Sequence, residues 1–285
     1  MTTTGLPTQT PTSPTTETAT LAAGSLRVTP VRVLRSEWTK FRSLRSTVIT
    51  LLVAVVLTVG LGALFSAVTA SQFPKFRPQQ QASFNAVVTS LGGITFSQLA
   101  LGVLGVLLVT GEYSTGMIRA SLTAVPRRLP VLWAKLAVFA AVVLVVSLVA
   151  SFVSFFLGQS LLSGPHLNAS IADPGALRSV IGSALYVTVA GMIGVALGAL
   201  LRNTAAGITT FVGLFFVVPP LTLLLPSSWT ANFVQYLPSN AGGALWGNTR
   251  GVENPLSPWT GFAVLCLWAA ILVAAAAYRL RKADA

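Results

Sequence analysis

The sequence is poor in charged residues: Asp, Glu, Lys and Arg make up 8% of its 285 residues. Soluble globular domains usually contain about 25% of these residues. Hydrophobic residues reach 53%, and the mean hydropathy is +0.77. This composition excludes an ordinary soluble domain and favours a protein whose surface faces lipid.

Cysteine and histidine are nearly absent, with Cys266 and His166 the single examples of each. A single cysteine excludes a disulfide within the chain, and two such residues cannot build a Cys/His metal centre. The sequence also lacks the GxxxxGK[ST] phosphate loop and the HExxH zinc motif. We therefore predict no catalytic, cofactor or metal site in this chain, which is not an enzyme by this reasoning.

Long apolar runs dominate what the sequence does contain. Each has about 20 or more residues, enough for a helix to cross a hydrocarbon core of about 30 Å. Their middle parts contain no charged residue, where a charge costs about 2.5–3.5 kcal/mol on insertion scales. The sequence therefore predicts an all-α polytopic membrane protein with six transmembrane helices at about Val48–Ala70, Phe84–Thr110, Leu129–Leu157, Ala176–Leu201, Thr204–Leu225 and Trp259–Tyr278.

The basic residues lie mostly on one side of these runs, with fourteen on the side of the N-terminus and four on the other. The excess of Lys and Arg in cytoplasmic segments predicts that both termini are cytoplasmic. We interpret the net charge of +12 as a signal for orientation and for anionic lipid headgroups, not for nucleic acid. The four outward residues are Lys75, Arg77, Arg178 and Arg250.

The first 26 residues are rich in Thr and Pro and have no apolar periodicity. Such a segment cannot bury a core, which predicts a disordered cytoplasmic tail over residues 1–26. The remainder, residues 27–285, is predicted to be one membrane domain.

A basic, amphipathic segment precedes the first span. After Pro30, the segment Val31–Arg45 has an apolar side on a helical wheel, and its site residues are Trp38, Lys40, Phe41, Arg42 and Arg45. This pattern predicts a helix in the inner interface, with Trp38 inserted and basic groups reaching phosphates. Arg45 falls on the apolar side, which suggests a turn into the first span. The alternative is a basic flank that only fixes topology.

The connection Gly111–Arg128 is the largest inward loop and contains Glu112. Ser114 or Thr115 is placed to cap a short helix that Pro126 would end. We expect this helix to dock a soluble partner, and the alternative is an ordinary connecting loop.

Within the spans, the polar residues Asn85, Gln98 and Tyr186 are predicted to form hydrogen bonds between helices, with a substrate role as the alternative. Small residues repeat every four positions in the fourth span, at Ala190, Gly194 and Gly198. This spacing predicts close helix packing with an unspecified neighbour. Further along, Pro219 and Pro220 should kink or end the fifth span, and Ser227–Pro258 suits short interfacial or re-entrant helices.

Two motifs together resemble those of a known family. RSEWTKFRSLRSTVITLL precedes and enters the first span, and GEYSTGMIRASLTAVPRR ends the second span. They resemble the membrane subunits of ATP-binding-cassette (ABC) type-2 exporters, most closely the six-span permeases common in high-GC Gram-positive bacteria. The resemblance extends from Arg27 to the C-terminus.

The resemblance implies a permease subunit in a bacterial cell membrane that pairs with a second permease copy, identical or related. It implies a separate cytosolic ABC ATPase that holds ATP and Mg, because this chain holds no cofactor. A coupling helix between spans 2 and 3 would contact that ATPase. Its residues would be Glu112, Tyr113, Thr115, Gly116 and Arg119, and Met117 departs from the threonine frequent in the family after that glycine.

Two other functions compete with that of an exporter permease. A membrane-embedded enzyme would need a catalytic dyad that the sequence lacks. A non-transporting membrane partner, such as an immunity, sensor or regulatory subunit, is compatible with the sequence. The cargo stays open among drugs, peptides, lipids and sodium-linked cargo.

Overall fold

The computed structural model describes residues 30–114, 129–164, 166–224, 226, 233–249 and 251–282. In these ranges the regular elements are all helical, and six helices are long and apolar enough to cross a membrane. The predicted fold class is thereby confirmed. The Thr/Pro-rich tail and most of the predicted coupling helix lie outside the described residues.

The first four long helices are α3 (Arg45–Gln72), α6 (Ile94–Ser114), α8 (Leu129–Leu162) and α9 (Ala176–Leu201). The last is α14 (Pro258–Lys282). At least one end of each helix lies within a few residues of the corresponding end of the predicted apolar run. A helix is expected over each run, because hydrocarbon requires every backbone polar group to be satisfied inside the helix.

The fifth span is composite. It begins as α10 (Thr204–Val212), continues through a π-helical segment at Gly213–Val217 and ends in α11 (Val218–Leu221). Proline has no N–H to donate, so Pro219 and Pro220 interrupt the regular α-helical ladder. The predicted effect of these prolines agrees with this change of helix type.

The second apolar run is divided, which differs from the continuous span expected from Phe84 to Thr110. A short helix, α5 (Ala86–Ser90), precedes a turn, and α6 starts at Ile94. A Cβ atom on Gly93 would lie 2.3 Å from the carbonyl oxygens of Leu57 and Thr58 on α3. The turn therefore brings two backbones closer together than a continuous helix with larger side chains would allow.

The centre of the fold is α9, which packs against α6, α8 and α14. Two close contacts join α6 and α9: a Cβ on Gly194 would lie 2.3 Å from Gly102 O, and one on Gly105 would lie 2.4 Å from Gly191 O. We call these contacts the glycine interface. The predicted small-residue packing thus occurs within the chain, between the second and fourth spans.

The predicted bonding of the polar span residues holds for two of the three. Tyr186 donates a hydrogen bond from α9 to Gln98 Oε1 on α6. Asn85 does not bond between helices: its side chain caps α5 by accepting the Val88 N–H at 3.1 Å. The N-terminus of a short helix has free N–H groups that such a side chain satisfies.

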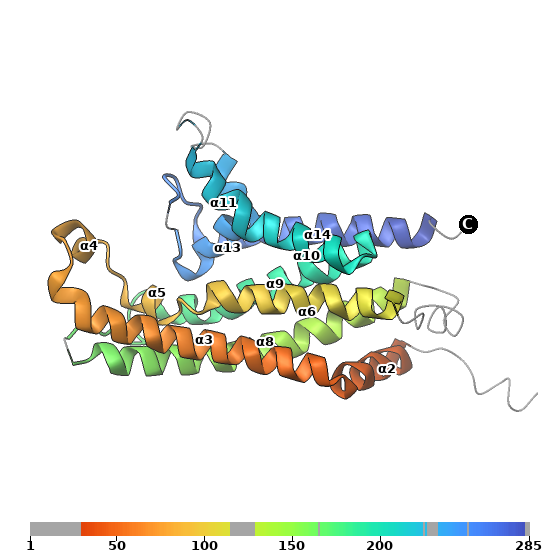
Figure 1. Cartoon of the computed structure of the whole chain (residues 1–285), viewed down its shortest axis with the longest axis horizontal. Coiled ribbons are helices and arrows are strands. Elements are labelled where there is room, and N and C mark those ends of the chain that lie inside the picture. The colour runs from red at the N-terminus through yellow and green to blue at the C-terminus, as the bar shows by residue number, and fades with distance from the viewer. Residues whose placement is uncertain are drawn as a thin grey trace, which may run out of the picture.

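A short helix, α13 (Pro238–Trp246), lies in the segment where re-entrant or interfacial helices were expected. It packs against α9 and α14, and its Trp246 is buried. The opposite end of the molecule contains α2 (Pro30–Ser43) and the C-terminal end of α14 (Figure 1). We call this end of the molecule the basic end, because the last turn of α14 holds Arg279, Arg281 and Lys282 there.

Candidate functional site: a buried charge cluster at the basic end

The helix α2 presents a mixed face to the protein. Val33, Glu37 and Phe41 are buried at four-residue spacing, whereas Trp38 is 48% exposed. Phe41 meets Phe139 of α8 edge-to-face, with ring centroids 6.4 Å apart. The predicted helix exists, and most of the apolar side that was expected to face the membrane is exposed, including Trp38. Phe41 of that side is buried instead, and the carboxylate of Glu37 lies on the same inner face.

The junction between α2 and the first span is sharp. Leu44 is extended (φ −80°, ψ 109°), and α3 begins at Arg45. The turn that the sequence suggested at Arg45 is therefore present. The exposed side chains of Trp38, Arg42 and Arg45 point away from the core, as an interfacial helix requires.

Four charged side chains meet behind α2. Lys135 Nζ of α8 lies 2.7 Å from Glu37 Oε2 and 2.9 Å from Glu112 Oε1 of α6. Lys40 Nζ lies 2.8 Å from Glu37 Oε1 and 3.3 Å from Glu112 Oε1. Two cations and two anions thus form a closed ring, which we call the charge cluster, and it joins α2, α6 and α8.

The charge cluster is shielded from solvent. Glu37, Glu112 and Lys135 are 5%, 7% and 4% exposed. Buried ions need close opposite charges, and here the four formal charges sum to zero. The second carboxylate oxygen of Glu112, Oε2, is buried and has no hydrogen-bond partner among the described residues. Among the described residues the cluster therefore has one unpaired acceptor, in the last turn of α6.

Neighbouring opposite charges shift the pKa values of both charged cluster residues on α2, Glu37 and Lys40. Burial alone would raise the pKa of the Glu37 carboxyl, but Lys135 and Lys40 outweigh it and hold this pKa below its usual value. Burial would lower the pKa of Lys40, but Glu37 and Glu112 outweigh it and raise this pKa above its usual value. Both groups are therefore charged across the neutral range.

The predicted coupling residues are only partly described. Glu112 and Tyr113 lie in the last turn of α6, not in a loop, and Thr115, Gly116 and Arg119 lie outside the described residues. The Tyr113 ring centroid is 5.3 Å from the guanidinium carbon of Arg202, at the end of α9. Tyr113 therefore connects the end of α6 to that of α9, whereas Glu112 connects it to α2 and α8.

Sequence reasoning missed two members of the charge cluster, Glu37 and Lys135. A signal for Glu37 was present: it lies four residues from both Val33 and Phe41, in a chain with only six acidic residues. Lys135 lies in the second turn of a 34-residue helix. Such a helix is about 51 Å long and exceeds a hydrocarbon core of about 30 Å, so Lys135 can lie at the membrane boundary.

A second polar cluster joins helices at the other end of α8. Ser154 Oγ donates to Thr58 O at 3.0 Å or to Ser90 O at 2.7 Å. Gln159 donates to Ala86 O at 3.1 Å and to Ser90 Oγ at 3.1 Å. These bonds satisfy carbonyls around the α5–α6 turn, which gives the cluster a structural role.

No group of three or more metal-ligating side chains occurs within the described ranges. The described part of the chain instead forms a bundle of long apolar helices with the charge cluster at its basic end.

The sequence matches the model of the ABC-2 family transporter protein over residues 33–219. The chain therefore belongs to the ABC-2 family of transporter membrane proteins. The match begins within α2 and ends within α11, so it includes all four members of the charge cluster. Membership implies a partner ATPase, but the match does not support the bacterial group suggested by the sequence. No curated protein matches the chain.

Proposed function

We propose that this chain is the permease subunit of an ABC exporter. It forms part of the translocation path and couples to a separate cytosolic ATPase, which holds ATP and Mg. The observation that carries this proposal is the charge cluster, because it joins α2 to α6 and α8, the two helices that precede and follow residues 115–128 in the sequence. The resemblance assigns Thr115, Gly116 and Arg119 in that segment to the coupling helix.

The cluster offers a physical route for coupling. A partner that binds residues 115–128 displaces the end of α6 and with it Glu112. Because Glu112 is paired with Lys40 and Lys135, α2 and α8 must follow it or exchange ion pairs. ATP binding shifts the helices only if the partner binds the two arrangements with different free energies. Long Lys and Glu side chains suit such re-pairing.

A second permease copy fits the uneven burial of the spans. In an 18-residue apolar stretch of each span, 72% of the residues are buried inside the chain in the fourth span, compared with 17% in the first and 17% in the fifth. The exposed faces of α3 and of the fifth span are apolar and suit lipid or another subunit. We propose that the cargo passes between two copies, with both termini in the cytoplasm as the basic residues predict.

The decisive experiment purifies the tagged chain from its native membrane in mild detergent, identifies bound proteins and measures ATP hydrolysis. We expect a stoichiometric ATPase subunit. In Glu112→Gln, hydrolysis should fall by about tenfold, within the range of about 5- to 150-fold typical of coupling free energies. Glu253→Gln, which neutralises an exposed carboxylate outside the cluster, is the matched control and should leave hydrolysis unchanged.

Two other outcomes would change the proposed function or the proposed role of the charge cluster. Absence of an ATPase from every detergent extract would favour a non-transporting immunity, sensor or regulatory partner. A bound ATPase whose activity ignores Glu112→Gln would retain the permease and reject the coupling role of the cluster. Membrane insertion of both variants is measured in parallel, because a loss of folding would imitate a loss of coupling.

A further inference from the structure

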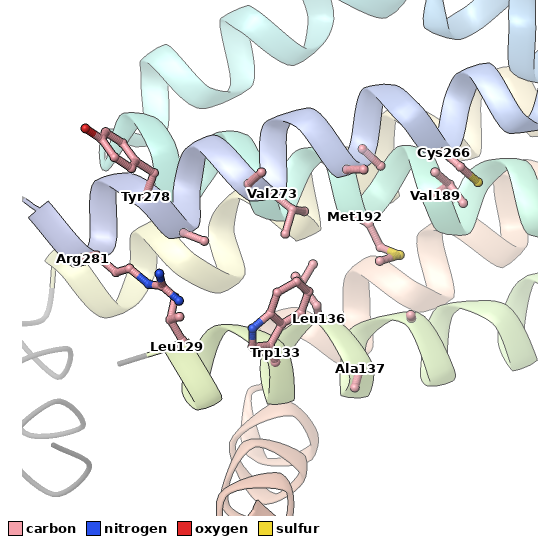
Figure 2. Close-up of a pocket in the computed structure, with 15 residues that line it drawn as sticks. Leu129, Trp133, Leu136, Ala137, Val189, Met192, Cys266, Val273, Tyr278 and Arg281 are labelled. Carbon is pink, nitrogen blue, oxygen red and sulfur yellow. The ribbon is translucent and has the colours of Figure 1, made fainter. Parts of the chain in front are cut away.

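An apolar groove of about 740 Å³ lies between α8 and α14, with α9 at its base. Its volume falls in the range of about 300–1,000 Å³ typical of small-molecule sites. α8 and α14 each pack along α9 but barely contact one another, which leaves the groove between them. The view in Figure 2 shows both helices beside α9, with Met192 between them.

Alanines on the two facing helices keep the groove open. Ala137 and Ala140 line it from α8, and Ala270, Ala274 and Ala277 line it from α14. Ala137, Ala270 and Ala274 are exposed in the described structure. A groove with small apolar side chains on both walls admits a flexible hydrocarbon chain and offers no hydrogen bond to a polar one.

One end of the groove differs from the rest. Tyr278 and Arg281 belong to the lining at the basic end, and Trp133 is 55% exposed in the groove. Figure 2 shows Arg281 extending from α14 toward Leu129 and Trp133 rising from α8. Among the described residues, no acidic side chain lines the groove and none forms an ion pair with Arg281. The site is therefore apolar along its length and cationic at its end.

We propose that this groove binds an acyl chain of an anionic phospholipid from the membrane leaflet at the basic end. The phosphate would lie on Arg281, whose planar guanidinium matches phosphate oxygens, and the chain would lie along the alanines. Charge complementarity selects this occupant: a second apolar helix would leave Arg281 unpaired, whereas the lipid headgroup meets it at the depth where phosphates lie. This proposal is independent of transport and of the ATPase.

The test is native mass spectrometry of the full-length chain in mild detergent with phosphatidylglycerol or phosphatidylcholine of identical acyl chains. We expect a retained phosphatidylglycerol molecule and weaker retention of phosphatidylcholine. Arg281→Gln should lower the phosphatidylglycerol affinity about fivefold, as loss of one basic group near anionic lipid predicts. Arg178→Gln removes the same charge at the opposite end of α9 and should change nothing.

A variant that fills the groove with a larger side chain tests the contact with the acyl chain separately from the contact with the headgroup. Ala274→Phe should reduce retention of both lipids, whereas Ala263→Phe should leave retention unchanged. Ala263 is an exposed alanine on α14 that does not line the groove, so the second variant controls for added bulk on the same helix. Thermal unfolding of each variant confirms that it is folded.

Three results would overturn the proposal. These are equal retention of the two lipids, equal effects of Arg281→Gln and Arg178→Gln, or unchanged binding in Ala274→Phe. In addition, Ala274→Cys in a Cys266→Ala background tests whether a second copy covers the groove. A disulfide-linked dimer formed in native membranes would assign the groove to an interface between copies, and an uncrosslinked monomer supports the lipid.

Discussion

The glycine interface and the charge cluster hold helices together by opposite means. In the glycine interface, the backbones of α6 and α9 touch, and a single added carbon would lie 2.3 Å from a carbonyl oxygen. In the charge cluster, three helices meet through long side chains whose contacts range from 2.7 to 3.3 Å. Direct backbone contact fixes one geometry, whereas flexible ion pairs can exchange partners. From this difference we expect a rigid centre and an adjustable end.

The largest effect is expected when a bulky side chain forces the glycine interface apart. Gly194→Leu would drive α9 from Gly102, so we expect destabilisation above about 4 kcal/mol, the range of severe core overpacking and strain. The readouts are the yield of folded protein and thermal unfolding in detergent. Gly60→Ala is the control, because a Cβ there meets nothing within 4 Å. A normally folded Gly194→Leu would show that the interface can yield.

The second prediction concerns an unpaired charge in the cluster. Lys135→Met leaves two buried carboxylates with only Lys40 and should cost about 3–5 kcal/mol of unfolding free energy. Lys75→Met, which removes an exposed lysine at the other end, should change stability little. The swap Glu112→Lys with Lys135→Glu restores the charge balance and should recover part of the loss. If the single variant unfolds like the wild type, the ion pairs do not hold α8.

A change of pH affects the charge cluster and not the glycine interface, because only the cluster contains titratable groups. The lowered pKa of Glu37 means that folding favours its ionised form. Its stabilisation is complete above the ordinary Glu pKa of about 4.3 and is lost as the pH falls through the lowered value. Thermal unfolding of the wild type and of Glu37→Gln should therefore differ at pH 7 and converge in acid. A constant difference would reject this role.

The smallest effect is expected from the hydrogen bond within the rigid centre. Tyr186→Phe leaves Gln98 Oε1 without its donor. Hydrogen bonds between membrane helices contribute about 0.6 kcal/mol on average, with about 1.7 kcal/mol as the largest measured. Unfolding of Tyr186→Phe should shift accordingly, and Tyr236→Phe, at an exposed ring, should not shift it. A loss of unfolding free energy as large as that of Lys135→Met would show that this neutral hydrogen bond stabilises the fold as much as the ion pairs of the charge cluster, which would contradict the prediction.

The candidate site was predictable in part. Glu112 stood out because few acidic residues occur near an inner membrane boundary, and α2 was predicted from its amphipathic pattern. Its buried face was not predicted, because the helical wheel assigned the apolar side to the membrane interface and did not indicate which residues contact the rest of the protein. Glu37 faces inward because Lys135, 98 positions away, neutralises it there. No local pattern contains that information.

The sequence alone determined the number of spans and the gathering of basic residues on one side, since both follow from composition and chain order. Hydrocarbon excludes unpaired backbone groups and central charges, so the apolar runs had to become helices. The turn at Gly93, the glycine interface, the charge cluster and the groove beside α14 became visible only in the folded chain. Each of these depends on the distance between atoms that belong to different helices, and helix packing sets that distance.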